Sequence, residues 1–133
     1  MQRSITAVII AVIIVSPLQA ATVNDFYASL LKRGIDHVTA GNYEAGAGEL
    51  KLAAFGLINS LEHYETALVY LAIASQHLDR EPQARAAATR VIAAERIEKH
   101  YATLALPPNV RKEFEVVAQK VLTAAQFETL RAK

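Results

Sequence analysis

The sequence predicts an all-α protein, and three observations support this prediction. Apolar and small residues recur at three- and four-residue steps through most of the chain, which is the period of an amphipathic helix. No stretch shows the alternation of apolar and polar residues that is typical of a half-buried strand. Hydrophobic residues make up 53% of the 133 residues, which is sufficient for the core of one domain. We therefore expect one helical domain over residues 22–133, after a separate N-terminal segment.

Residues 1–20 have the pattern of a secretory signal peptide. Arg3 supplies a positive charge, and an apolar core follows from Ile5 to Val15. This core has about half of the roughly 20 apolar residues that a membrane-spanning helix needs. We therefore expect cleavage near Ala20, no stable membrane span afterwards, and a protein exported to the bacterial envelope, in the periplasm or outside the cell. The alternative is an uncleaved N-terminus that tethers the protein to the membrane.

The first predicted hairpin covers about residues 28–60. Its first helix is expected to begin before the repeat itself, at a cap on Thr22 or Asn24. It ends near Gly41, which can adopt a positive φ. Its second helix runs from Tyr43 to Asn59 or Ser60. Glycines inside both helices predict a close approach of their backbones.

The second predicted hairpin covers about residues 62–100. Its first helix runs from Leu61 or Glu62 to Leu78, and the nearly continuous apolar stretch from Ala67 to Ala74 marks it as the most buried helix. Its second helix begins at Pro82, a residue that suits a first helical turn, and ends near His100.

A break at Thr103 to Pro108 separates the second hairpin from one last helix, expected over about residues 108–131. Each proline restricts the conformation of the residue before it, so the chain must be extended or turned here. A terminal helix covers the exposed apolar end of the last repeat in stacked helical proteins. We assign the same capping role to this helix.

The two hairpins resemble tetratricopeptide repeats. The first carries small, aromatic and aliphatic residues at the spacing of that family, namely Gly34, Gly41, Tyr43, Leu50 and Ala53, with Gly46 where the family usually has Ala. The second is a fainter copy, marked by Ala72, Ala84, Ala88 and Val91. The resemblance covers about residues 28–93 and implies two stacked antiparallel hairpins. Because three repeats are usually needed to bury a continuous core, a count of two favours self-association.

The resemblance also implies a binding groove. In tetratricopeptide proteins the first helix of each hairpin lines a concave surface that binds extended peptides or partner helices. By position, that surface would comprise Leu31, Lys32, Ile35, Val38, Thr39, Val69, Tyr70, Ile73, Gln76 and His77. The alternative is that the last helix or another subunit fills this groove.

The sequence offers no chemical motif that competes with this interpretation. The chain has no cysteine, and its four histidines have no metal-ligand spacing, so we expect neither a metal site nor a cofactor. Glu62 and Glu65 fit the favourable position of acids in a first helical turn. Glu81 with Arg85, and Glu95 with Lys99, fit solvated pairs one turn apart.

The equal numbers of acidic and basic residues indicate which classes of molecule the protein binds. Acidic and basic residues are equal in number after residue 20, which argues against nucleic acid as the main partner. We therefore expect a non-enzymatic module that binds a protein or peptide partner or acts as a scaffold. The alternative is an envelope enzyme or small-molecule carrier with a pocket between helices.

Overall fold

The computed structural model of the chain describes residues 23–132 and shows an all-α protein in that range. The predicted signal peptide and the proposed cap at Thr22 lie outside the described residues. The helices are α1 (Val23–Thr39), α2 (Tyr43–Gly56), α3 (Leu61–His77), α4 (Glu81–Ile97), α5 (Pro108–Val121) and α6 (Ala124–Arg131), with a short 3-10 helix η1 (Tyr101–Thr103) before α5.

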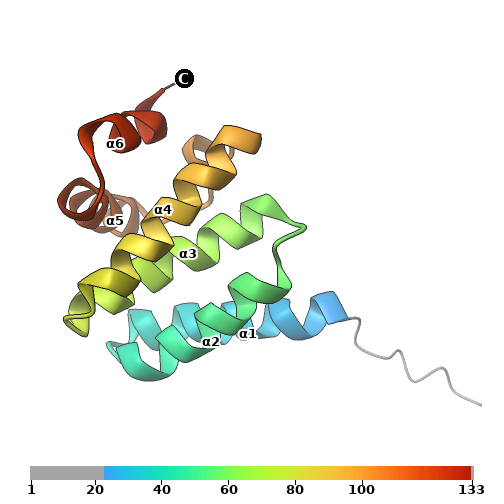
Figure 1. Cartoon of the computed structure of the whole chain (residues 1–133). Helices are drawn as coiled ribbons and strands as arrows, with labels where there is room; N and C mark the ends of the chain where they lie inside the picture. Colours follow the sequence, from blue (N-terminus) through green and yellow to red (C-terminus); the bar gives the residue numbers. More distant parts are fainter. Residues whose placement is uncertain (1–22, 133) are drawn as a thin grey trace, which may run out of the picture.

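Adjacent helices pack in pairs, and the pairs follow one another along the molecule (Figure 1). Helices α1 and α2 form the first pair, α3 and α4 the second, and α5 and α6 a third, shorter one. Each later pair also rests on the one before it, because α3 contacts both α1 and α2, and α5 contacts both α3 and α4. The first helix of each later pair therefore packs against both helices of the pair before it.

The two helices of the first pair approach closely at Gly34 and Gly46, as predicted. A Cβ atom on Gly46 would lie 2.7 Å from Val38 Cγ2 and 3.1 Å from the carbonyl oxygen of Gly34. A Cβ atom on Gly34 would lie 2.6 Å from Leu50 Cγ. Side chains at these positions would separate the helices, so the glycines determine how closely α1 and α2 pack.

The turns within the first two helix pairs both contain a residue with a positive φ. Gly41 has φ 82° and ends α1, as the sequence predicts. Asp79 has φ 56° at the matching place after α3, where its left-handed conformation lets the chain turn into α4. Asn42 precedes α2 but makes no side-chain capping hydrogen bond. The turn therefore depends on backbone geometry.

Helix α3 is the most buried helix of the described chain, as predicted. Every residue from Ala67 to Ser75 is buried, because α2, α4 and α5 all pack around this helix. Ala72 on α3 and Ala84 on α4 are both fully buried, and these two helices pack against each other.

Two predicted helix ends are wrong. Helix α2 ends at Gly56, before Asn59, because the chain forms a turn in which the Ser60 N–H donates to the Leu57 carbonyl. Helix α4 ends at Ile97, before His100, because the Glu95 carboxylate accepts the backbone N–H groups of His100 and Tyr101. These N–H groups would otherwise continue the ladder of helical hydrogen bonds.

The prediction of one capping helix is also wrong. The segment divides into α5 and α6 at Leu122 and Thr123, where Thr123 and Gln126 exchange side-chain and backbone hydrogen bonds in a capping box. Arg85 Nε donates to the Val121 carbonyl at 3.0 Å, which satisfies an oxygen at the end of α5. Helix α6 then packs on α4.

In residues 23–132, no helix combines the length and the apolar character that crossing a bilayer requires.

Candidate binding surfaces

The structure brings five of the ten predicted groove residues together around one recess, here called the α3–α5 recess. Helix α5 supplies a further wall, and Tyr43 at the start of α2 closes one side. The recess has a volume of about 160 Å³ and is lined by Val38, Thr39, Tyr43, Tyr70, Ile73, His77, Asn109, Val110 and Glu113. The first turns of α5 therefore occupy part of the surface that the sequence assigns to a partner.

The other five predicted groove residues do not line this recess. Leu31 and Val69 are buried in the core. Ile35 and Gln76 are half-buried, and Lys32 is exposed on α1. Ile35 and Lys32 therefore remain accessible on α1, while Leu31 and Val69 act as packing residues.

His77 joins three helices at the rim of the recess. Its ring stacks on Tyr43 with the centroids 4.1 Å apart and an angle of 3° between the planes. Its Nε2 atom lies 2.6 Å from Glu113 Oε1 on α5. His77 thereby ties α3 to α2 on one side and to α5 on the other, so the shape of the recess depends on this residue.

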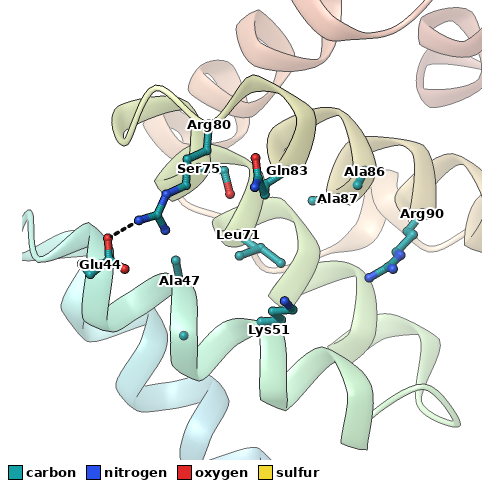
Figure 2. Close-up of a pocket in the computed structure, with 11 residues that line it drawn as sticks. Glu44, Ala47, Lys51, Leu71, Ser75, Arg80, Gln83, Ala86, Ala87 and Arg90 are labelled. Carbon is teal, nitrogen blue, oxygen red and sulfur yellow. Dashed lines mark hydrogen bonds and ion pairs between the residues drawn. The ribbon is translucent and has the colours of Figure 1, made fainter.

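A larger cleft lies between α2 and α4, with α3 as its floor (Figure 2). Its volume is about 360 Å³, within the usual range for sites that bind small ligands or a few side chains. The lining residues come from the three helices and from the residue that precedes α4, and are Glu44, Ala47, Gly48, Lys51, Leu71, Ser75, Arg80, Gln83, Ala86, Ala87 and Arg90. We call this the α2–α4 cleft.

Charges in the α2–α4 cleft are unevenly paired. At one end Arg80 Nη2 lies 2.7 Å from Glu44 Oε2. At the other end Lys51 and Arg90 extend from opposite walls (Figure 2), and neither has an ion-pair partner among residues 23–132. Since Leu71 and the alanines between the two ends are apolar, the cleft combines a hydrophobic floor with a net positive charge.

The α2–α4 cleft was not predicted, because the predicted groove comprised residues from only the first helix of each hairpin. The signal was present in α2, where Lys51 and Leu52 follow Gly48 at three and four residues and therefore lie on the same side of the helix. Large apolar residues on this side are exposed, as Leu52 is 45% and Phe55 is 76% accessible. Exposed apolar side chains next to a cleft are typical of an interaction surface.

A pair of acids is buried between α3 and α4, against the sequence prediction. Glu65 is 0% exposed and Glu95 is 5% exposed, so neither is a solvated helix-surface acid. Neither carboxyl oxygen of Glu65 makes a hydrogen bond of normal geometry. Burial, and then the nearby charge of Glu95, raises the pKa of Glu65 to about 8. Glu65 is therefore protonated at neutral pH.

The other predicted surface pair, Glu81 and Arg85, is confirmed, with Arg85 Nη2 2.8 Å from Glu81 Oε1. Among residues 23–132, no three side chains of the types that bind metal ions gather at one place.

Comparison with known proteins finds no matching family model, no matching curated protein and no matching solved structure.

Proposed function

We propose that the protein is an exported interaction module of the tetratricopeptide type, and that the side formed by α1, α3 and α5 binds a segment of a partner protein. One observation carries the proposal. Five positions that the sequence assigns to a groove, on two different helices, meet around a single recess. Their apolar members form its walls and their polar members its rim, which is the usual arrangement of a protein interface.

The size of the recess suits one anchoring side chain of a partner. Val38, Tyr70 and Ile73 are almost fully buried and offer apolar walls to such an anchor. Thr39 and His77 are exposed at the rim, where they can hydrogen-bond to the backbone of the segment that carries it. Ile35 and Lys32 extend the surface along α1.

Helices α5 and α6 bear on the oligomeric state of the proposed module. Self-association was predicted because the sequence shows only two hairpins. Helices α5 and α6 add a further pair that covers α3 and α4. These added helices cover apolar surface of α3 and α4 that two hairpins alone would leave exposed, which supports a monomeric module.

Export is supported by the pattern of residues 1–20, with its charged start and short apolar core. N-terminal sequencing of the protein from producing cells tests this part of the proposal. A first residue at Ala21 or Thr22 is the expected result, and recovery of the intact N-terminus would support the membrane-tethered alternative.

The enzyme alternative has weaker support. Glu65 and Glu95 lie together, and the raised pKa of Glu65 is a property that catalytic acids often share. Glu65 has no exposed surface through which it could touch a substrate, however. We therefore assign the pair a structural role.

Substitutions at the rim of the recess test the proposed groove. Thr39→Arg places a long charged side chain over the recess, and Thr89→Arg makes the same change on an exposed part of α4. We expect the proteins retained by the wild-type chain from an envelope extract to bind Thr89→Arg normally and to be lost from Thr39→Arg. Equal retention by both variants, with melting temperatures like that of the wild type, would remove the groove from consideration.

A further inference from the structure

The outer face of α2 presents an apolar stripe to solvent. Gly48, Leu52 and Phe55 follow one another at four- and three-residue steps, so they lie along one side of the helix. Leu52 and Phe55 are both exposed, and Phe55 keeps 76% of its accessible surface. Lys51 lies beside this stripe and also lines the α2–α4 cleft. The stripe and the cleft therefore form one continuous surface, here called the α2–α4 surface.

Gly48 has no packing role within the described chain. A Cβ atom at this position would meet nothing within 4 Å, in contrast to Gly34 and Gly46. A glycine inside a helix costs roughly 1 kcal/mol relative to alanine. Contacts within residues 23–132 do not offset that cost. A helix of another molecule that approaches α2 closely would account for the missing side chain.

The charges on this surface indicate the chemistry of the partner. Lys51 extends from α2 and Arg90 from α4, on the two walls of the cleft (Figure 2). The acid on the rim, Glu44, is already paired with Arg80 at the other end. Neither Lys51 nor Arg90 has an ion-pair partner in the described range 23–132. An apolar stripe with one such cation beside it and another across the cleft complements an amphipathic helix that carries acidic residues next to its apolar face.

We propose that the α2–α4 surface is a second docking site, which binds an acidic amphipathic helix of another protein. The site is distinct from the α3–α5 recess. Leu71 and Ser75 face the cleft, while Ile73 and His77 face the recess. Residues two positions apart point to opposite sides of a helix, so α3 separates the two surfaces. The module can therefore hold two partners at once, and this proposal does not depend on the groove.

A pair of labelled peptides tests the docking site on the full chain. One peptide forms an amphipathic helix with leucines on one face and glutamates beside them, and the other has glutamine at every glutamate position. We expect the wild-type protein to bind the glutamate peptide about tenfold more tightly in fluorescence anisotropy, because two partly screened ion pairs supply the difference. Added salt should reduce this difference.

Variants assign the binding to the surface. The double variant Lys51→Gln with Arg90→Gln should bind both peptides equally, at the affinity that the wild type shows for the glutamine peptide. The matched control, Arg96→Gln with Lys112→Gln, makes the same change of charge at exposed positions outside the cleft and should behave as the wild type. Phe55→Ser should weaken binding of both peptides about tenfold or more, since it removes an exposed apolar anchor without disturbing the core.

Three results would overturn the proposal. The first is equal or absent binding of the two peptides by the wild type. The second is an equal loss in the control variant, which would indicate a general effect of charge. The third is a wild-type dimer in sedimentation that Phe55→Ser converts to a monomer, because a second copy of this chain would then occupy the surface.

Discussion

Glu65 on α3 and Glu95 on α4 lie side by side in the interior, each withdrawn from solvent. Their roles differ. Glu95 accepts the backbone N–H groups of His100 and Tyr101 and so fixes the end of α4. Glu65 has no such donors and avoids a second buried charge by keeping its proton. One acid of the pair organises the backbone, and the other is stable there only in its neutral form.

The protonated state of Glu65 predicts that stability falls as pH rises. The folded chain holds this proton up to a pKa of about 8, whereas the unfolded chain releases it near 4.5. Between these values unfolding releases a proton, so stability from this group is complete below pH 4.5 and declines until about pH 8. We expect the Glu65→Gln variant to resemble the wild type near pH 4.5 and to be more stable at pH 8, on the order of a few kcal/mol. Urea unfolding at both pH values measures the difference.

Glu62→Gln is the matched control for this experiment, because Glu62 is an exposed acid on the same helix. It should follow the wild-type pH dependence. A constant difference between Glu65→Gln and the wild type across this pH range would show that Glu65 is ionised in the folded protein.

Replacing two glycines of α2 by alanine should change the stability of the protein in opposite directions. At Gly46 a methyl group would meet Val38 Cγ2 at 2.7 Å, so Gly46→Ala should force α1 and α2 apart and lower the free energy of unfolding by about 1–3 kcal/mol. At Gly48 nothing lies within 4 Å, so Gly48→Ala should raise it by up to about 1 kcal/mol through helix propensity. Both variants gain the same propensity, and thermal or urea unfolding compares them directly. Equal shifts would show that α1 does not pack closely on Gly46.

Replacing Arg111 should lower the stability of the folded protein. Its two terminal nitrogens donate to the carbonyls of Tyr101 and Leu104 at 2.9 and 2.8 Å, and its guanidinium lies 4.8 Å from the centre of the Tyr101 ring. A lysine cannot reproduce this fork. We expect Arg111→Lys to lower the free energy of unfolding by about 1–3 kcal/mol. Lys112→Arg, on an exposed neighbouring position, is the reverse control and should leave it unchanged.

Thr123 should stabilise α6 without affecting the other helices. Its hydroxyl oxygen accepts the Gln126 N–H, and the Gln126 side chain accepts the Thr123 N–H in return. Thr123→Ala removes one half of this capping box and should cost about 1 kcal/mol. Hydrogen exchange should show faster exchange of the α6 amides and unchanged protection in α3. Thr123→Ser keeps the hydroxyl and should restore protection, and a uniform loss of protection in Thr123→Ala would contradict the local role.

The parts of the fold that the sequence predicted are those set by helix period and by small residues. The first four helices, the turn at Gly41 and the close approach of Gly34 to Gly46 all follow from local spacing. The division between α5 and α6 was missed, although a threonine followed three residues later by glutamine signals a helix start. The apolar residues Phe114, Val117 and Val121 follow one helical face up to the break, and this period was extended too far along the chain.

The candidate sites were harder to predict, because they depend on which helix faces which. Glu65 lies four residues after Leu61 and three before Leu68, on the buried side of α3, and this spacing could have placed it in the core. The acids' proximity to one another could not be predicted, because it depends on how α3 and α4 pack. Likewise, the recess around His77 needs α5, whose position relative to α3 no local pattern specifies.

The order of the helix pairs in space follows their order along the chain, and this bears on how the protein acquires its structure. Each pair contacts chiefly the one made just before it, so few loops between distant segments must close. The first two pairs hold most of the buried residues and can pack before the C-terminal third is synthesised. Folding should therefore proceed quickly from the N-terminal pair toward the last one, with the short pair α5–α6 added to a surface already in place.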